Sequence, residues 1–378
     1  MKSKSSSKII FLVSNDLIYD QRVQRHAKLM MENDFEVLLL GRLKSTTNTN
    51  IKIDIPSARF KLPFERSWLF YASLNIRFFF YLLFRKFEVV WSNDLDTLPV
   101  AFLIAKIRGK KLFYDSHEFF TGVPELQNRK LVSGIWGSFE KFLLNRIEFK
   151  ITVSNGVKAL YKQVYNSEFE VVRNIGNSKF LDKKAVVPNV LGFSFDQHFV
   201  IYQGALNKDR GLESLILAMK DVADLKLLIV GSGDIDNELK QIVVDENLLD
   251  KVFFTGMIEP SNLRIITPKA IAGLSIEIPS NENYSNCLPN KFFDYLEAEI
   301  PIIAYPNKEV QFLVEKFELG VFIENHHPKS ISKVLNEFPK DWKNNLGFKN
   351  HLFNAKKELN WETESKKLIN YFSLMLDK

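Results

Sequence analysis

The chain has 378 residues, of which 46% are hydrophobic and 25% are charged, with a formal net charge of +6. This length predicts two domains of ordinary size, and the apolar fraction allows a hydrophobic core in each. The positive charge and a pI of about 9.0 favour an anionic partner such as a phosphate, a nucleotide or an acidic membrane surface. The single cysteine, Cys287, excludes an intrachain disulfide and a metal site built from several cysteines.

The sequence predicts neither a signal peptide nor a membrane-spanning helix. The apolar run at 9–13 is shorter than the core of a signal peptide. No window holds about 18 uncharged apolar residues, and the nearest candidate, 68–84, is interrupted by Arg77. We therefore expect a cytoplasmic protein.

Short β-branched or aromatic runs alternate with longer amphipathic segments, such as 19–32, along the whole chain. This alternation predicts parallel βαβ units, and a polar, poorly periodic stretch at 177–197 predicts a linker between two sets of them. We expect two doubly wound domains with a cleft between them, which bind ligands at the carboxyl ends of their strands. The predicted strands are 9–14, 36–40, 89–92, 111–114 and 151–154, then 199–203, 226–231, 251–255, 271–276 and 301–305.

The first strand is followed by a polar segment that contains Asp20, Arg22 and Arg25. Asp20 suits the N-cap of the next helix. The segment contains no GxGxxG motif, which argues against a dinucleotide-dependent dehydrogenase. Two interpretations stay open: a capped surface helix with solvated arginines, or a cleft rim formed by Asp20 and Arg22.

Two predicted strands that follow one another in the chain end in polar clusters, and these clusters look like the edge of an active site. His117 is the only histidine so placed. Two alternatives stay open: a structural role for His117, and a role for Asp115 as the cap of the following turn. The clusters are Asn93-Asp94-Leu95-Asp96 and Asp115-Ser116-His117-Glu118.

In the second half, Gly204 closes a strand and Arg210 precedes the start of a helix. An arginine near a helix N-terminus suits bidentate phosphate binding. The next strand ends in Gly231-Ser232-Gly233, where small residues permit close approach of a ligand or simply form a tight turn.

The segment 286–306 predicts an anion site. Pro289 suits the first turn of a helix, Asn286 is a plausible cap before it, and Lys291 and Asp294 share one face of that helix. The free N–H groups at such a helix start favour phosphate.

In their order and spacing these segments resemble glycosyltransferase family 4, whose members are retaining enzymes that use nucleotide sugars and have the GT-B fold. The resemblance covers nearly the whole chain. The matching segments are Asp20-x-Arg-Val-x-Arg25, Asn93-Asp-Leu-Asp-Thr-Leu98, Tyr114-Asp-Ser-His-Glu118, Tyr202-Gln-Gly-Ala-Leu206 with Arg210-Gly211, Val230-Gly-Ser-Gly233, Phe254-Thr-Gly256 and Leu288-Pro-Asn-Lys-Phe-Phe-Asp-Tyr295.

The resemblance implies an α/β fold with two Rossmann-like domains, each built on a doubly wound parallel sheet, that face a cleft. The N-terminal domain, 1–180, would bind the acceptor, and the C-terminal domain, 190–356, would bind the nucleotide sugar. A helix at 357–378 would pack back on the first domain.

The resemblance also implies roles for individual residues. His117 would contact the donor sugar near the reacting carbon, and Arg210 would bind the diphosphate, so both are candidate catalytic residues. An acidic pair that lines the donor site in the family falls here on Asn286 and Asp294. Further donor-site candidates are Gly204, Gly231, Gly233, Cys287, Leu288 and Lys291, with Glu282 and Lys208 as possible substitutes for an acidic and a basic residue of the family.

The acceptor side or cleft rim would be formed by Asp20, Arg22, Asn93, Asp94 and Glu118. Residues 59–87, rich in aromatic and basic side chains, predict either a membrane-interface helix or a core-packing helix. The expected acceptor is an envelope glycan or a lipid-linked molecule, with peripheral association at the inner membrane face and no nucleic acid partner.

The implied reaction transfers a sugar, with retention, from a UDP- or GDP-sugar. Arg210 and Lys291 would stabilise the leaving diphosphate, with no metal or cofactor required. A sugar-nucleotide epimerase of the same fold and a non-catalytic nucleotide-sugar-binding protein are the alternatives. Glu299 stands where a glycine usually ends the helix in this family, and a left-handed glutamate there costs about 1 kcal/mol.

Overall fold

The computed structural model describes residues 7–18, 20–45, 47, 53–120, 130–176, 190 and 192–378. The chain forms two compact units: unit 1 is Met1–Asn174 with Glu362–Lys378, and unit 2 is Ile175–Trp361. The sequence predicted domains at 1–180 and 190–356 and a C-terminal helix at 357–378. Most of the predicted linker, 177–197, lies outside the described residues.

Unit 1 contains a seven-stranded sheet in which every pair of neighbouring strands is parallel. Its spatial order is β3-β2-β1-β4-β5-β6-β7. The sequence did not predict β3, a short strand with exposed ends, or β7, which has two residues. The strands are β1 Lys8–Asp16, β2 Glu36–Leu43, β3 Ser57–Lys61, β4 Val89–Asn93, β5 Lys111–Ser116, β6 Phe149–Thr152 and β7 Glu170–Val171.

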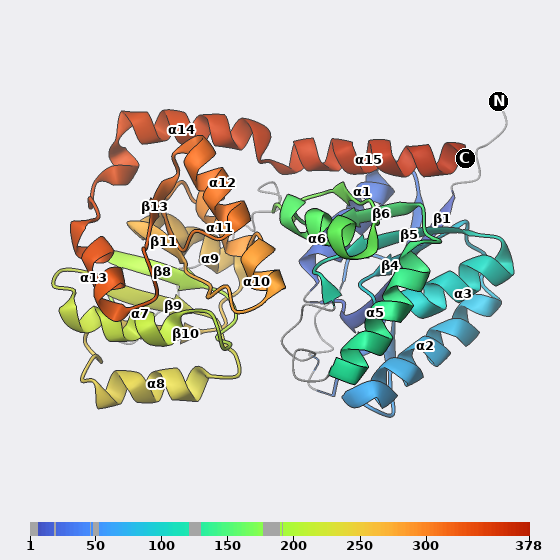
Figure 1. Ribbon diagram of the computed structural model, residues 1–378, viewed down its shortest axis with the longest axis horizontal. Coiled ribbons are helices and arrows are strands. Elements are labelled where there is room, and N and C mark those ends of the chain that lie inside the picture. Colours follow the sequence, from blue (N-terminus) through green and yellow to red (C-terminus); the bar gives the residue numbers. More distant parts are fainter. Residues whose placement is uncertain are drawn as a thin grey trace. The chain divides into compact units, whose positions relative to one another are not determined.

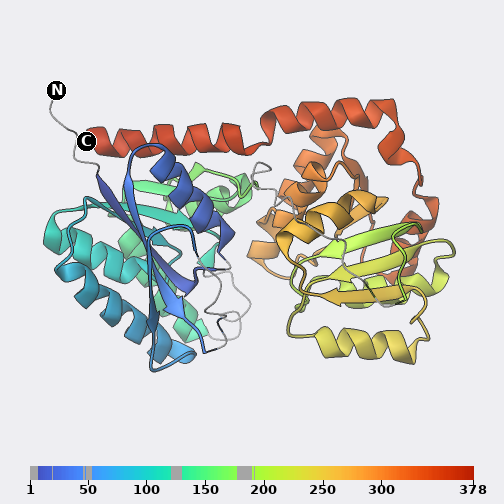
Figure 2. The same cartoon turned by 180° about the vertical axis from the view of Figure 1, so that it is seen from behind.

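Helices cover both faces of this sheet (Figures 1 and 2). Because successive strand residues point to opposite faces, Val90 packs in one cluster with α2 and α3. Its neighbour Trp91 stacks on Phe372 of α15 on the other face, with ring centroids 5.6 Å apart. The helices of unit 1 are α1 Gln21–Glu32, α2 Ser67–Leu83, α3 Leu98–Arg108, α5 Lys130–Leu144, α6 Asn155–Tyr165 and α15 Trp361–Asp377.

Polar contacts fix α15 to unit 1 at both of its ends. Lys111 Nζ donates to the carbonyl oxygens of Met375 and Leu376, at 2.7 and 2.8 Å, where a cation complements the C-terminal end of the helix dipole. Near the start of the helix, buried Glu364 accepts from the backbone N–H and the guanidinium of Arg173, at 2.9 and 3.3 Å.

Unit 2 contains a six-stranded sheet, again with parallel neighbours, in the order β10-β9-β8-β11-β12-β13. The sequence predicted every strand except β13, which has three half-buried residues. The strands are β8 Phe199–Gln203, β9 Lys226–Val230, β10 Val252–Gly256, β11 Ala272–Ser275, β12 Ile302–Ala304 and β13 Gly320–Phe322.

The helices of unit 2 divide between two hydrophobic clusters, one on each face of the sheet. Val200 and Ile229 pack with residues of α7, α8 and α13, whereas Ile201 and Leu228 pack with α9, α11, α12 and α14. These helices are α7 Leu212–Ala218, α8 Asp236–Asp245, α9 Pro260–Ile266, α10 Glu282–Asn286, α11 Asn290–Glu297, α12 Lys308–Phe317, α13 Pro328–Glu337 and α14 Leu346–Glu358. The predicted pair of Rossmann-like parallel-sheet domains is therefore confirmed.

The prediction that Asn286 caps the helix after it was wrong. Asn286 is the last residue of α10, and its side-chain amide donates to the carbonyl of Glu282 at 2.8 Å. Pro289 occupies the N-cap of α11 in extended conformation. A proline disfavours helical geometry in the residue before it, so the chain runs extended between the two helices.

None of the helices within the described residues is long and apolar enough to cross a bilayer.

Glu299 adopts the predicted left-handed conformation, with φ 58°, just after α11. We expect Glu299→Gly to raise the free energy of unfolding by about 1 kcal/mol, because glycine lacks the Cβ that makes this conformation costly. The ion pair with Lys356 that is lost, at 2.8 Å, is exposed and contributes little. Urea denaturation measures the change.

Glu297→Gly is the matched control, since Glu297 is an exposed glutamate with helical geometry, the last residue of α11. Glycine there should lower the free energy of unfolding by about 1 kcal/mol. A Glu299→Gly protein no more stable than the wild type would contradict the assignment of strain to this residue.

Candidate functional site

Each unit has a cluster of charged residues near the point where the strand order of its sheet reverses. These points lie between β1 and β4 in unit 1 and between β8 and β11 in unit 2. Ligands of doubly wound sheets bind at such reversals, outside the carboxyl ends of the strands. The two clusters therefore mark the candidate site of each unit.

In unit 1, His117 lies between two carboxylates from neighbouring strand ends. Its Nδ1 is 3.1 Å from Asp94 Oδ2, and its Nε2 is 3.6 Å from Asp115 Oδ2. The backbone N–H of His117 also donates to Asp94 Oδ1 at 2.8 Å. Asp94 itself has φ 59°, and its N–H donates to the carbonyl of Asp115 at 2.8 Å. Asp94 thus holds the imidazole at contact distance, while Asp115 attracts it from the other side without a hydrogen bond.

Arg22 and Asp115 form a buried ion pair, which contradicts the interpretation of Arg22 as a solvated surface arginine. The guanidinium donates from Nη2 to Asp115 Oδ1 at 2.8 Å and from Nε to Oδ2 at 3.0 Å. It also donates to the carbonyl of Val172 at 2.9 Å. The hydrophobic residues of α1 pack against the sheet, and this packing buries Arg22 with them. A buried guanidinium requires an anion at contact distance.

The remaining candidates of unit 1 differ in exposure. Asn93 is buried and donates to the carbonyl of Leu12 at 3.0 Å, so it connects β4 to β1. Asp20 caps α1 by accepting from the N–H of Val23 at 3.1 Å, as predicted. Glu118 is exposed.

Two histidines of unit 1 have pKa values that are shifted in opposite directions. Burial lowers the pKa of His117, but the carboxylates of Asp94 and Asp115 outweigh burial and hold this pKa well above its ordinary value. Burial, together with the charge of Arg22, lowers the pKa of His26 to about 4. Burial, then the charge of Asp94, raises the pKa of Asp96 to about 7. His117 is therefore cationic at neutral pH, and His26 is neutral.

In unit 2, three charged residues meet at the carboxyl ends of β8 and β11. Lys291 Nζ, on the first turn of α11, is 2.6 Å from Glu277 Oε1. Arg210 Nη1, in the loop before α7, is 3.9 Å from the same oxygen. The Glu277 side chain is fully buried, that of Lys291 is 7% exposed and that of Arg210 is 23% exposed. Two cations thus converge on one buried anion.

Aromatic rings hold the two cations of unit 2. Lys291 Nζ lies 3.8 Å from the ring centroid of Tyr202, and the guanidinium carbon of Arg210 lies 4.7 Å from that of Tyr284. Such contacts stabilise a cation without consuming its hydrogen-bond donors. Nε of Arg210 is buried and, among the described residues, has no hydrogen-bond partner.

The glycines after β9 are required by packing. A Cβ at Gly231 would lie 1.9 Å from the carbonyl oxygen of Gly204, and one at Gly233 would lie 2.3 Å from that of Leu206. These residues therefore allow the loops after β8 and β9 to touch. At Gly204 a Cβ would lie 3.5 Å from Lys291 Cε, so that position faces the charged cluster.

The other donor-site candidates fall into two groups. Leu288 is buried in the core, and burial raises the pKa of Cys287 to about 12, which leaves it a neutral thiol. Asn286 is also buried. Asp294, in contrast, is exposed on α11 and accepts from Gln203 Nε2 at 2.9 Å.

Sequence reasoning missed Glu277, although it follows the end of β11 by two residues. The rule applied to the other strands, that polar residues directly after a strand face the ligand edge, would have selected it. The strand predicted at 271–276 ends at Ile276, the residue before Glu277. The apolar residues on both sides of Glu277 concealed it.

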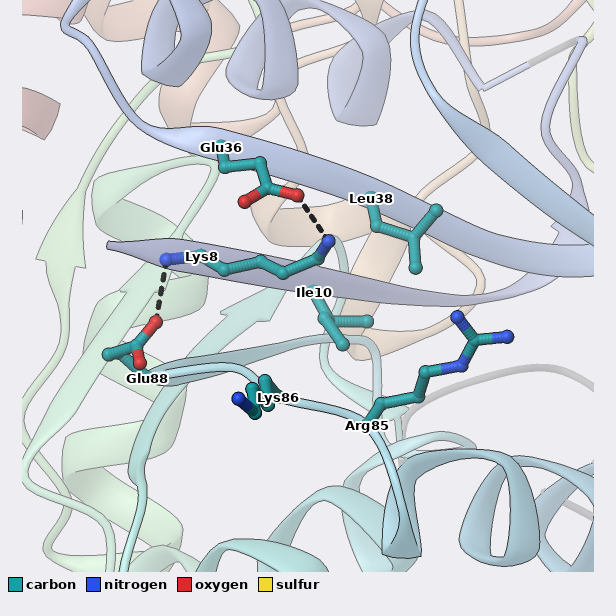
Figure 3. A pocket seen from close by; sticks show the side chains of 7 residues that line it. All are labelled: Lys8, Ile10, Glu36, Leu38, Arg85, Lys86 and Glu88. Atoms are coloured by element: carbon teal, nitrogen blue, oxygen red, sulfur yellow. Dashed lines mark hydrogen bonds and ion pairs between the residues drawn. The ribbon is translucent and has the colours of Figure 1, made fainter. Parts of the chain in front are cut away.

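A depression of about 330 Å³ lies at the opposite, amino-terminal edge of the unit 1 sheet (Figure 3). Its two carboxylates are already engaged: Lys8 Nζ binds Glu36, and Lys8 N donates to Glu88 Oε2 at 2.7 Å. Within the described residues, no group of three or more histidine, cysteine, aspartate or glutamate side chains is arranged to hold a metal ion.

The second unit matches a known protein family. Residues 184–352 match the family model described as Glycosyl transferases group 1. This match includes every unit 2 residue of the charged cluster, and it confirms the resemblance inferred from the sequence.

Curated proteins with similar sequences include two glycosyltransferases. An uncharacterised glycosyltransferase of Methanocaldococcus jannaschii is 22% identical over 244 residues, which are 60% of this chain and 60% of that protein. The α-monoglucosyldiacylglycerol synthase of Streptococcus pneumoniae is 22% identical over 141 residues, which are 36% of this chain and 31% of that protein. The matched part thus spans less than two thirds of either relative.

Solved structures share the fold over nearly the whole chain. A sucrose-phosphate synthase from Thermosynechococcus elongatus has a TM-score of 0.77 at 18% identity, covering 98% of this chain and 99% of that one. HepE of Anabaena, solved with UDP and glucose, has a TM-score of 0.75 at 14% identity, covering 97% and 99%. The GT-B fold is therefore confirmed.

The charge state of His117 is directly measurable. We expect its imidazole to be protonated at pH 7.5 because Asp94 and Asp115 flank it, whereas buried His26 stays neutral until about pH 4. Nitrogen-15 NMR of the histidine rings distinguishes the two states. The folded chain binds the His117 proton more tightly than the unfolded chain does. Its contribution to stability is therefore complete below the ordinary pKa of 6.5 and is lost as pH rises through the raised value.

The spectrum of His117→Gln identifies the resonance, because the cationic signal should vanish in that variant. A neutral His117 at pH 7.5 would show that the carboxylates do not outweigh burial.

Proposed function

Because residues 184–352 match the family model described as Glycosyl transferases group 1, we propose that this protein is a glycosyltransferase that takes its sugar from a UDP- or GDP-sugar. The observation that carries the proposal is the pair of cations, Arg210 and Lys291, beside the glycine loops at the strand-order reversal of unit 2. Phosphate oxygens are the ligand that such a pair suits best.

The charges of this cluster fit a diphosphate. Arg210 and Lys291 together carry two positive charges, and Glu277 offsets only one of them. The guanidinium is partly exposed and keeps donors available. The N-terminus of α11, which carries Lys291 on its first turn, adds a positive dipole end.

The proposed reaction is hexosyl transfer with retention at the anomeric carbon, as the family resemblance implies. Negative charge develops on the leaving diphosphate in the transition state, and fixed cations in a partly buried site stabilise it without reorganisation. His117, a cation clamped between two carboxylates, positions the sugar in this proposal. The carboxylates of Asp94 and Asp115 beside it support a positioning role, because they favour the protonated imidazole, which is not a nucleophile.

Two alternatives differ in what they do with a nucleotide sugar. An epimerase would convert a UDP-sugar in the absence of an acceptor, whereas a transferase would at most hydrolyse it slowly. A non-catalytic binder would do neither. Product analysis by chromatography after incubation with UDP- and GDP-sugars, with and without a crude glycolipid acceptor fraction, separates the three.

Arg210→Ala should weaken the binding of UDP or GDP by about 1.5–3 kcal/mol, the scale of a hydrogen bond to a charged group. Isothermal titration calorimetry measures the affinity of both nucleotides. Lys240→Ala, which removes an exposed cation of α8 that pairs with Asp236 at 3.1 Å, should leave the affinity unchanged. Equal affinities of the wild type and Arg210→Ala would exclude Arg210 from the phosphate site.

The acceptor proposal rests on helices α2 and α3 of unit 1. The core-packing interpretation of this region holds for one side of α2, where Phe70, Leu74, Phe78 and Leu82 are buried. A second side is exposed, and we call it the basic aromatic face. It consists of Trp68, Ile76, Phe80, Phe84, Leu103 and Ile107, with the cations Arg77, Arg85, Lys86, Lys106 and Lys110 on or beside the same helices.

Charge and exposure make an anionic lipid surface the fitting partner of the basic aromatic face. Neither α2 nor α3 contains an aspartate or glutamate, so acidic headgroups meet no repulsion from these helices. Exposed aromatic and aliphatic side chains insert at the headgroup level. We assign to this face peripheral binding at the cytoplasmic side of a membrane, with a lipid-linked or envelope glycan acceptor.

Sedimentation with lipid vesicles tests the basic aromatic face. The wild type should bind vesicles that contain phosphatidylglycerol, and Phe80→Ser with Phe84→Ser should abolish this binding, because 61% and 83% exposed aromatic rings are lost. Phe353→Ser, which removes a 61% exposed ring of unit 2, is the matched control and should bind as the wild type does. Wild-type protein that stays in solution with acidic vesicles would reject the lipid partner.

A further inference from the structure

Glu277 is the one member of the unit 2 cluster to which the family resemblance gives no role. Its side chain is fully buried, and Oε1 lies 2.6 Å from Lys291 Nζ. The other carboxylate oxygen accepts from Ser275 Oγ at 2.9 Å. Both carboxylate oxygens therefore accept a hydrogen bond, and Oε1 faces the cations.

Glu277 and Lys291 depend on each other for their charges. A buried ammonium or carboxylate without a partner loses its proton or gains one, because the charged form is costly outside water. Burial lowers the pKa of Lys291, but Glu277 outweighs it and raises this pKa above its ordinary value. In the same way Lys291 holds the pKa of Glu277 below its ordinary value against burial.

Arg210 shares the same anion more loosely. Its Nη1 is 3.9 Å from Glu277 Oε1, beyond hydrogen-bond distance. Coulomb attraction orients the guanidinium at this range, while its donors stay available to another anion. Glu277 thus attracts both cations but hydrogen-bonds only Lys291.

We propose that Glu277 is a positioning residue for the donor diphosphate, which keeps Lys291 charged and fixed beneath the site while leaving Arg210 free to bind phosphate. This inference rests on the proposed function and deepens it. It explains why a phosphate site contains a carboxylate: without this anion the buried lysine would not remain a cation.

Removal of the Glu277 charge should make nucleotide binding depend on pH. The other charged or titratable groups that face Lys291 are Tyr202 of β8, Arg210 before α7 and Cys287 before α11. Arg210 is a cation, and burial keeps Cys287 a neutral thiol, so neither supplies an anion in place of Glu277. In Glu277→Gln the pKa of Lys291 should fall, since burial and the charge of Arg210 both lower it, and the lysine becomes neutral as pH rises.

Calorimetric titration of the full chain with UDP and GDP at pH 7.0 and pH 9.5 tests this. The bases of UDP and GDP themselves lose a proton near pH 9.5, so the wild type is the reference at each pH. Relative to the wild type, Glu277→Gln should lose about tenfold or more in affinity between the two values, the loss of one charge-assisted contact. Glu277→Gln with Lys291→Arg should bind without this pH dependence, because a guanidinium stays protonated throughout. A purely structural role of Glu277 would lower affinity equally at both pH values.

The outcomes separate the two proposals. If the wild type binds neither UDP nor GDP, the proposed function fails and the role of Glu277 fails with it. If the wild type binds and Glu277→Gln shows no pH dependence, only the role of Glu277 is overturned. Should Glu277→Gln not fold, Glu277→Asp keeps the charge one methylene further from Lys291 and should show a smaller loss in the same direction.

Discussion

The burial of charge at the ends of parallel strands is the constraint on which both candidate sites depend. Each sheet directs polar side chains toward one edge, and the surrounding helices exclude water there. A carboxylate in that position is tolerated only with a cation at contact distance. Asp115 has Arg22, and Glu277 has Lys291, at 2.8 and 2.6 Å. The candidate functional groups, His117 and Arg210, lie against these pairs.

The two clusters use the same principle with opposite results. In unit 1, two carboxylates surround one partly exposed imidazole and make it a cation. In unit 2, one carboxylate lies beneath two cations and leaves a net positive charge toward the loops. A pair of buried ions adds little net stability compared with an apolar core, so the value of each pair lies in the orientation and charge state that it imposes on its neighbours.

The sequence predicted the sheets better than the contacts within each site. Alternating apolar runs located ten strands, because buried parallel strands are continuous hydrophobic segments. The strands that were missed, such as β3 and β13, are short and half exposed, so their composition resembles that of loops. His117 was selected as a candidate because it follows a strand directly, and Arg210 because it precedes the start of a helix.

The contacts between polar side chains were not predictable from the sequence, because they depend on which side chains the fold brings together from distant segments. Arg22 looked like a solvated arginine, since nothing near it in the sequence shows that Asp115 lies against it. Asn286 looked like a cap, since the extended residues before Pro289 are a backbone effect of that proline. Glu277 was hidden among apolar neighbours, and its role became visible only with the position of Lys291.

The attachment of α15 to unit 1 has a consequence for the order in which the protein is made. Phe372 stacks on Trp91 in the middle of the unit 1 sheet, yet it follows all of unit 2 in the sequence. During synthesis, the part of that face which α15 covers therefore stays exposed until the second domain has left the ribosome, although α1, whose His26 also contacts Trp91, is already available to cover the rest. Domains fold as units while the chain emerges, so unit 2 completes its core before unit 1 does. The first domain to be translated is the last to be finished.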